Sequence, residues 1–209
     1  MNKNKSMGQL IVLSGPSGSG KGTIIKSLLA GRDDTVLSVS MTTRDPRPGE
    51  MDGVHYHFCT REEFEKVIAE DGFLEYAEYN GNYYGTPEAP IRRWLSEGKN
   101  VILEIEVQGA EKVMNHRSDL VSIFITIPSI EELERRLRDR GTETEDKVRG
   151  RMETARWELS RAFRYQYVVL NDEVDLATRR INTIIDAEAM RYSRMENTVL
   201  EVLKDVSTQ

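Results

Sequence analysis

Ten residues near the amino end, Ser14 to Thr23, have the types and spacing needed to bind phosphate. They spell SGPSGSGKGT and follow an apolar run at residues 10–13. Glycines let the backbone curl so that several N–H groups face one anion, and a helix beginning near Thr23 would add its positive end. Lys21, directly after Gly20, is spaced to reach the β- and γ-phosphates of a nucleoside triphosphate. The predicted loop comprises Gly15, Pro16, Ser17, Gly18, Ser19, Gly20, Lys21, Gly22 and Thr23.

Gly22 stands where such loops usually carry a Ser or Thr whose hydroxyl binds magnesium. Because glycine has no hydroxyl, two arrangements are open. Either Thr23 takes over this role one residue later, or Mg²⁺ is held by nucleotide oxygens and waters. The sequence therefore predicts Mg²⁺ bound together with the triphosphate and assigns it no direct protein ligand.

Two arginines further along the chain indicate a second phosphate site. Arg44 and Arg47 lie three residues apart, with Pro46 between them. Two guanidinium groups can offer forked pairs of donors to a dianionic monophosphate, which ammonium groups match less well. The alternative is that both are ordinary surface charges on a loop. Nine more arginines fall between Arg135 and Arg164 and could receive a compact polyanion.

Alternating strand and helix patterns predict the elements that position these residues. Apolar runs rich in β-branched residues predict strands at 10–13, 101–105, 122–127 and 167–170, with a weaker one at 36–40. Helical patterns are found at 23–29, 87–97, 108–115, 130–138, 147–162 and in one long final helix at 174–203. Such alternation predicts a parallel sheet with helices on both faces.

Two segments interrupt this pattern. Residues 42–82 are dense in Arg, Pro, Gly, His and Tyr and predict an antiparallel lobe around a short helix at 62–69. Residues 139–145 combine turn residues with mixed charges and predict a mobile flap. We expect a core of residues 1–40, 101–139 and 165–209, an inserted lobe with its connecting helix at 41–100, and a lid at 140–164.

A series of motifs resembles guanylate kinase, a nucleoside monophosphate kinase that converts GMP to GDP with ATP. Beyond the phosphate loop, the motifs are SMTTRDPRPGE at 40–50, Gly53-x-x-Tyr56-x-Phe58, Phe73-Leu74-Glu75, GNYYGT at 81–86, EIEVQG at 104–109, RGTE at 140–143 and Asn171-Asp172. Each is weak alone, but in this order they are specific and cover about residues 9–190. The resemblance implies a P-loop α/β/α fold of three layers, with a central parallel sheet, an inserted mixed α+β lobe that binds GMP, and a helical lid.

The resemblance also implies roles for single residues. Glu75 and Thr86 correspond to the guanine site, where a carboxylate and a hydroxyl complement the N1–H, 2-amino and O6 groups of the base. Adenine would bring a lone pair against Glu75, a mismatch worth several kcal/mol. The implied GMP-binding set is Ser40, Arg44, Arg47, Tyr56, Glu75, Tyr84, Thr86, Glu104 and Glu106.

The remaining implied roles concern the triphosphate. Arg136 and Asn171 join the loop as ATP-binding residues, Asn171 as the adenine contact or, alternatively, as a turn residue that caps the final helix. Glu104 and Glu106 replace the Asp-x-Asp that the family usually has near the metal's waters. The implied catalytic residues are Lys21, Arg44, Arg140 and Arg151. Phosphoryl transfer needs alignment and charge stabilisation, and no general base.

Composition excludes several other classes of protein. The net charge of −6 is unfavourable for general nucleic-acid binding, and no apolar run approaches the roughly 20 residues of a membrane span. The polar start lacks a secretory signal, and Cys59, the one cysteine, cannot form an internal disulfide. We therefore expect a cytoplasmic enzyme whose partners are ATP and GMP, and dGMP as a further substrate. The three histidines do not form a metal set; His55 and His57 are expected to pack or hydrogen-bond.

Two alternatives remain open at this point. A relative with the same fold phosphorylates a ribose bisphosphate, but it needs no guanine pocket. Guanylate-kinase-like modules of scaffold proteins bind phosphopeptides without catalysis, but they typically lack an intact phosphate loop. The long final helix could form a subunit interface in a homodimer or higher homo-oligomer.

Overall fold

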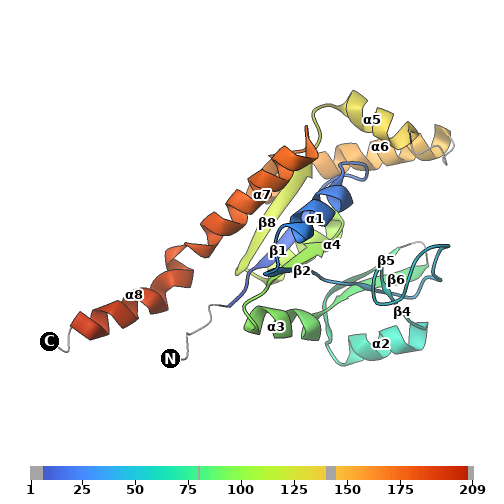
Figure 1. The fold of residues 1–209 in the computed structure, drawn as a ribbon. Coiled ribbons are helices and arrows are strands. Elements are labelled where there is room, and N and C mark those ends of the chain that lie inside the picture. Colours follow the sequence, from blue (N-terminus) through green and yellow to red (C-terminus); the bar gives the residue numbers. More distant parts are fainter. Residues whose placement is uncertain (1–6, 80, 140–144, 207–209) are drawn as a thin grey trace.

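A parallel sheet of five strands forms the centre of the molecule. The computed structural model describes residues 7–79, 81–139 and 145–206 (Figure 1). In spatial order the strands are β2 (Thr35–Leu37), β7 (Asn100–Glu104), β1 (Leu10–Ser14), β8 (Leu120–Thr126) and β9 (Tyr167–Leu170). All neighbouring pairs among them are parallel. The expected fold class, α/β with a central parallel sheet, is confirmed.

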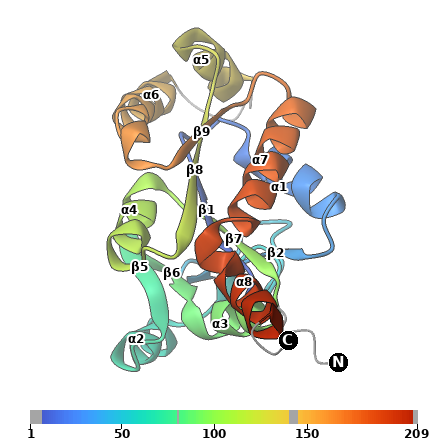
Figure 2. The same ribbon diagram turned by 90° about the vertical axis from the view of Figure 1, so that its left-hand side faces the viewer.

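Helices cover both faces of this sheet, as Figure 2 shows. Because successive side chains of β1 point to opposite faces, Ile11 and Leu13 pack toward one layer and Leu10 and Val12 toward the other. The first layer contains α1 (Lys21–Ala30) and α7 (Val174–Ala189), and the second contains α3 (Glu88–Ser96) and α4 (Val107–His116). The result is the three-layer arrangement that the sequence predicts.

The order of the strands brings two functional segments together. Leu13, near the carboxyl end of β1, lies beside Glu104 at the carboxyl end of β7. The phosphate-binding loop follows β1, so it starts next to this carboxylate. In open α/β sheets ligands bind at this edge, beyond the carboxyl ends of the strands.

The inserted lobe contains a second sheet, in the order β4 (His57–Phe58), β3 (Met41–Thr42), β6 (Asn82–Pro87) and β5 (Phe73–Tyr79), with α2 (Arg61–Ala69) packed on it. β6 pairs antiparallel with β3 and with β5, as expected. The pairing of β3 with β4 is parallel, unlike the prediction. A parallel pair needs a long crossover, and residues 43–56 supply it. Phe64 of α2, fully buried, stacks on Phe73 and Tyr83.

A third cluster of apolar side chains joins α5 (Ile130–Arg138) to α6 (Glu145–Leu159), which the short helix η1 (Ala162–Arg164) follows. Leu133 and Leu137 of α5 pack there with Val148 and Met152 of α6. We name α5 and α6 together the lid body. Helix α3 is predicted from the sequence to belong to the lobe, but its side chains Ile91 and Leu95 pack into the core. The predicted division of the chain into a core, a lobe and a lid that move relative to one another stays a prediction.

The prediction of one long final helix is wrong. The chain forms α7 and then α8 (Tyr192–Val206), with the break at Met190 and Arg191. Neither glycine nor proline marks this break. It follows Glu188, a buried carboxylate that accepts a hydrogen bond from Tyr167 and pairs with Arg191. Beyond the break, α8 leaves the sheet and projects from the body (Figure 1).

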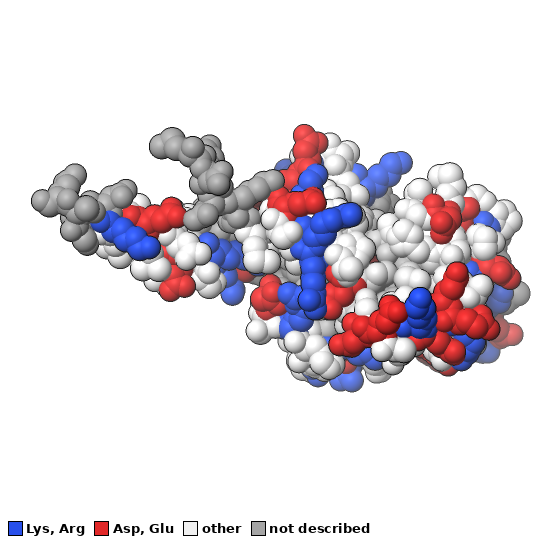
Figure 3. Space-filling model, turned by 90° about the horizontal axis from the view of Figure 1, so that it is seen from below, with Lys and Arg blue, Asp and Glu red and all other residues white. Residues whose placement is uncertain are grey.

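Charge and hydropathy of the folded chain agree with the composition. On the described part of the face drawn in Figure 3, Lys and Arg side chains alternate with Asp and Glu and form no continuous basic area. Among the residues that the structure describes, no helix has the length and apolar character needed to cross a bilayer.

Candidate active site

The phosphate-binding loop joins β1 to α1 at the edge of the sheet. Gly20 caps α1 in the left-handed region, with a φ of 87°. A side chain there would collide with the side-chain nitrogen Nδ2 of Asn171. The first turn of α1 carries no acidic residue. The positive end of this helix is therefore available to an anion.

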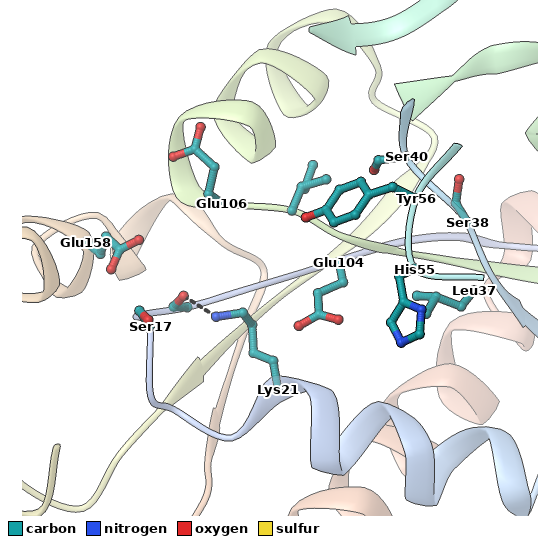
Figure 4. A pocket seen from close by; sticks show the side chains of 12 residues that line it. Ser17, Lys21, Leu37, Ser38, Ser40, His55, Tyr56, Glu104, Glu106 and Glu158 are labelled. Atoms are coloured by element: carbon teal, nitrogen blue, oxygen red, sulfur yellow. Dashed lines mark hydrogen bonds between the residues drawn. The ribbon is translucent and has the colours of Figure 1, made fainter. Parts of the chain in front are cut away.

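Lys21 lies across the loop at the start of α1. Its Nζ donates to the carbonyl oxygens of Gly15 at 2.6 Å and Pro16 at 3.1 Å (Figure 4). The ammonium group therefore lies next to the loop amides. From there a rotation of the side chain can bring it to a phosphate in the loop.

A cleft of about 370 Å³ opens between the loop, the end of β7 and the lobe, a size within the usual range for small-molecule sites. Ser17 and Lys21 line one wall, Glu104 and Glu106 the floor, and Ser40, His55 and Tyr56 the lobe side. Residues of the expected ATP and GMP sites therefore share one cleft.

Two carboxylates follow the buried part of β7 and face this cleft. Incomplete hydration raises the pKa of Glu104, and the Lys21 ammonium opposes the rise. Glu106 caps α4 by accepting a hydrogen bond from the Gly109 amide at 3.2 Å. One oxygen of Glu106 thus has a structural partner, while the side chain still lines the cleft.

Glu75 and Thr86 meet on neighbouring strands of the lobe. They face each other in the β5–β6 register, and the Thr86 hydroxyl donates to Glu75 Oε1 at 2.7 Å. Burial raises the pKa of Glu75, while the Thr86 hydrogen bond and Lys112 oppose the rise. A Cβ at Gly109 would lie 3.1 Å from Glu75 Oε2 and 3.9 Å from Glu106 Oε1. The absent side chain of Gly109 therefore makes room for two converging carboxylates.

A cluster of one arginine and two tyrosines, which we name the Arg44 cluster, lies further along the same lobe. Tyr84 and Thr86, two residues apart on β6, share a face of the sheet. The Arg44 guanidinium interacts with the Tyr84 hydroxyl and lies 5.5 Å from the centre of the Tyr56 ring. The Tyr56 hydroxyl is a hydrogen-bond donor at neutral pH, as any phenol is, and burial raises its pKa further. Arg44, Tyr56 and Tyr84 therefore converge as the resemblance implies.

Glu50 holds Arg44 in place. Arg44 Nη2 donates to both carboxylate oxygens of Glu50 at 3.0 Å, and both side chains are largely buried. The backbone amide of Arg47 donates to the same carboxylate at 2.8 Å. Arg47 itself is exposed, so it borders the cluster without entering it as Arg44 does.

Arg136 and Asn171 flank the loop on the side of the lid body. Asn171 is 2% exposed, and its side-chain amide donates to the Ser19 carbonyl oxygen at 2.7 Å. Arg136 is held by Glu132 at 2.7 Å and donates to the Asn171 carbonyl oxygen. Asn171 does not cap α7, whose first residue follows Glu173. This excludes the alternative role as a helix cap.

The other predicted residues are less closely grouped. Thr23 is exposed in the first turn of α1, and Gly22 has open space around it. Arg151 is half-buried on α6 and does not line the cleft. Arg140 lies outside the described residues.

Three residues near the site were not expected from the sequence. His55 lines the cleft, Glu50 pairs with Arg44, and Glu158 of α6 reaches the cleft beside Ser17. Of these three, only Glu158 could have been found from the local sequence pattern. It continues the buried stripe of Val148, Met152 and Ala155, where a charged residue is unusual.

The arrangement combines two kinds of recognition around one cleft. The loop, Lys21 and the end of α1 suit the phosphates of a triphosphate. The Arg44 cluster suits a second, smaller phosphate, and the Glu75–Thr86 pair presents acceptors and a hydroxyl to the edge of a base. Such a site can align two nucleotides for phosphoryl transfer.

Comparisons with known proteins agree with this geometry. A family model described as guanylate kinase matches residues 7–188. The guanylate kinase of Clostridium perfringens strain SM101 is 52% identical over 207 residues, 98% of this chain and 96% of that relative. That of Desulfitobacterium hafniense strain Y51 is 50% identical over 187 residues, 90% of this chain and 94% of its own.

A solved structure leads to the same family. The crystal structure of guanylate kinase from Anaplasma phagocytophilum matches with a TM-score of 0.74 and 37% sequence identity, over 91% of this chain and 90% of its own. This chain belongs to the guanylate kinase family.

Proposed function

We propose that this chain transfers the terminal phosphoryl group of ATP to GMP, giving ADP and GDP. One observation carries the substrate assignment. Glu75 and Thr86, joined by a hydrogen bond of 2.7 Å, lie at Gly109 beside Glu106, which lines the cleft together with Lys21 and the phosphate loop. Family membership supports the same reaction.

ATP binds at the loop in this proposal. Its phosphates take the amides at residues 15–23 and Lys21. Arg136 and Asn171 border the adenine end, because both lie beside Gly20 and together hold that end of the loop.

GMP binds in the lobe. Arg44 and Arg47 receive its phosphate, with hydroxyl donors from Ser40, Tyr56 and Tyr84. Glu75 accepts from N1–H and the 2-amino group, and the Thr86 hydroxyl turns its one proton from Glu75 to O6. Glu104 and Glu106 lie between the two nucleotides. None of these contacts needs the ribose 2′-hydroxyl, so dGMP is proposed as a further substrate.

The chemistry is in-line transfer between two bound phosphates. Lys21, Arg44, Arg140 and Arg151 are the proposed catalytic residues, because charge spreads over the equatorial oxygens in the transition state. The GMP phosphate is already a competent nucleophile near neutral pH, so no side chain has to remove a proton from it. Closure of the lid over both nucleotides would exclude water and suppress hydrolysis.

Mg²⁺ accompanies ATP in this proposal. Glu104 and Glu106 place two carboxylates in the cleft against the one ammonium group of Lys21, so an added cation suits two incoming phosphate groups. No group of three His, Cys, Asp or Glu residues among the described ones could hold a metal by itself. This fits Mg²⁺, which usually keeps several waters and takes one or two carboxylates plus substrate phosphates. When bound, it would neutralise phosphate charge, with Glu104, Glu106 or Thr23 nearest.

The direct test measures ADP formation with ATP, Mg²⁺ and each nucleoside monophosphate in turn. We expect turnover with GMP and dGMP, and a kcat/KM for AMP lower by about 10⁴-fold. Equal rates with AMP would contradict the proposed base site. Turnover of a ribose bisphosphate without GMP activity would favour the alternative kinase, and phosphopeptide binding without turnover would favour a binding module.

A dependence on ATP, together with a single cysteine, supports a cytoplasmic location.

A second copy of this chain is the proposed partner of α8. Arg194, Asn197 and Glu201 of this helix line a hollow against the body, so its apolar stripe faces away from the body. The exposed apolar side chains are Tyr192, Met195, Val199, Leu200, Val202 and Leu203.

Val199→Glu is therefore expected to convert a dimer into a monomer, measured by sedimentation equilibrium. A carboxylate at the centre of the stripe would be buried without a partner on association. Asn197→Asp adds the same charge on the opposite side of α8 and should leave the dimer intact. A wild-type chain that sediments as a monomer would refute the proposed pairing.

A further inference from the structure

Glu158, in the last turn of α6, is a buried carboxylate that the proposed reaction does not use. It is 7% exposed, and its Oε2 has no hydrogen-bond partner among the described residues. The side chain points into the cleft next to Ser17 and across from Lys21 (Figure 4). An unpartnered buried oxygen is costly, so its presence calls for a functional reason.

The surroundings of Glu158 connect it to the loop. Burial raises its pKa, and the Glu106 carboxylate acts in the same direction. The Lys21 ammonium and a hydrogen bond from the Ser17 backbone amide favour the charged form. Ser17 and Glu158 line the cleft next to each other (Figure 4), so the carboxylate adjoins the tip of the phosphate loop.

A second contact joins the same part of the loop to the lid body. A Cβ at Gly18 would lie 3.0 Å from Leu133 Cδ1 and 3.2 Å from Leu137 Cδ2, so the loop backbone packs directly on α5. Gly18 also has a φ of 91°, which a side chain rarely adopts. Ser17 lies beside Glu158 of α6, and Gly18 packs on α5. Since α5 and α6 share one apolar cluster, both loop residues adjoin the lid body.

The helical period relates Glu158 to a residue of the proposed transfer step. Arg151, Ala155 and Glu158 are spaced i, i+4 and i+7, so they share one face of α6. Glu158 stands at the end anchored on the loop, and Arg151 lies two turns nearer the opposite end. A change in the contact between Glu158 and Ser17 would therefore alter where Arg151 meets the phosphates.

We propose that Glu158 is a positioning residue for phosphoryl transfer, which ties the tip of the phosphate loop to α6 and so sets the position of the lid body over bound ATP. The inference rests on the proposed function. It assigns Glu158 no contact with substrate. A carboxylate suits this role because it accepts a hydrogen bond from a backbone amide about twice as strongly as a neutral oxygen does.

The proposal predicts a lower rate without a loss of stability. Glu158→Gln keeps the shape of the side chain and removes a buried charge, so Tm should rise or stay the same. The weaker contact with Ser17 should lower kcat by about tenfold. The Kd values for MgATP and GMP should stay within about threefold, because the nucleotide-binding groups are unchanged. A purely structural residue would instead lower Tm, affinity and rate together.

The experiment compares the full wild-type chain with Glu158→Gln, Glu158→Asp and Glu153→Gln. Glu153 is exposed on the same helix and provides the matched control. Glu158→Asp keeps the charge and should retain more activity than Glu158→Gln. Steady-state kinetics, calorimetric binding and thermal unfolding give the rate, affinity and stability of each variant. Wild-type kcat in Glu158→Gln would overturn the proposal, and so would a joint loss of rate, affinity and stability.

Hydrogen exchange separates this proposal from the proposed function. Peptides that contain Ser17 should exchange faster in Glu158→Gln than in Glu153→Gln, whether or not the protein phosphorylates GMP. Unchanged exchange at the loop would refute the contact itself. A wild-type protein that fails to form GDP would refute the proposed function, and the exchange result would still decide on the contact.

Discussion

Replacing Lys21 with alanine is expected to lower kcat for GDP formation by about 10²- to 10³-fold, the usual cost of removing one preorganised donor from a site where charge develops. Lys21 Nζ already lies 2.6 Å from the Gly15 carbonyl oxygen, within the loop that the phosphates would occupy. The Kd for GMP should change by less than about twofold, because the proposed GMP site lies in the lobe, away from Lys21. Turnover is measured by coupled ADP production and GMP binding by calorimetry.

The matched control for this change is Lys26→Ala. Lys26 is exposed on the same helix, one turn further from the loop, and its replacement should leave kcat unchanged. If Lys21→Ala kept more than about a tenth of the wild-type rate, the assignment of the ATP site would be wrong. Loss of GMP binding together with turnover would point to a folding defect.

Glu75→Gln is expected to weaken GMP binding by about 10²-fold and to leave MgATP binding unchanged, since hydrogen bonds to a charged group are worth about 1.5–3 kcal/mol each. Guanine offers two donors at N1–H and the 2-amino group, and a carboxylate accepts both. An amide accepts one and turns its own NH₂ toward the other. Calorimetric titration of each nucleotide measures the effect. Glu78→Gln, an exposed change on the same strand, should bind GMP normally.

The same variant should be more stable than the wild type at neutral pH. Burial raises the pKa of Glu75, so the folded state binds this proton more tightly than the unfolded state does. The stability that depends on Glu75 therefore falls as pH rises from about 4.3, the ordinary glutamate value, through the raised pKa. The Tm of Glu75→Gln should exceed that of the wild type at pH 7.5, and the gap should shrink below pH 4. A lower Tm at pH 7.5 would show that the carboxylate stabilises the fold.

Much of the fold could be predicted because it depends on local patterns. The loop from Gly15 to Lys21 needs left-handed backbone at fixed places, and glycines mark them. The central parallel strands β1, β7 and β8 are short apolar runs, buried on both faces. By contrast, the break before α8 carries no glycine or proline and follows Glu188, which is buried and accepts a hydrogen bond from Tyr167. Single-residue patterns do not report such tertiary contacts.

The site shows the same division. Chemistry and resemblance together marked Arg44, Tyr84, Glu75 and Thr86, and the hairpin of β5 and β6 brings the last three together. The roles of Glu50 and Glu158 depend on which segments pack together after folding. In the sequence Glu50 is an ordinary polar loop residue, and only the folded loop places it against Arg44. The spacing of Arg44 and Arg47 suggested two equivalent cations, whereas only Arg44 is enclosed.

The pairing of Arg44 with Glu50 also affects how fast substrate and product exchange. Because Glu50 already pairs with the guanidinium, an arriving nucleoside monophosphate competes with a resident anion for it. The gain in free energy is smaller than for an unpaired arginine, and Glu50 is still beside Arg44 when the reaction ends. We expect this competition to favour rapid departure of the diphosphate over tight retention.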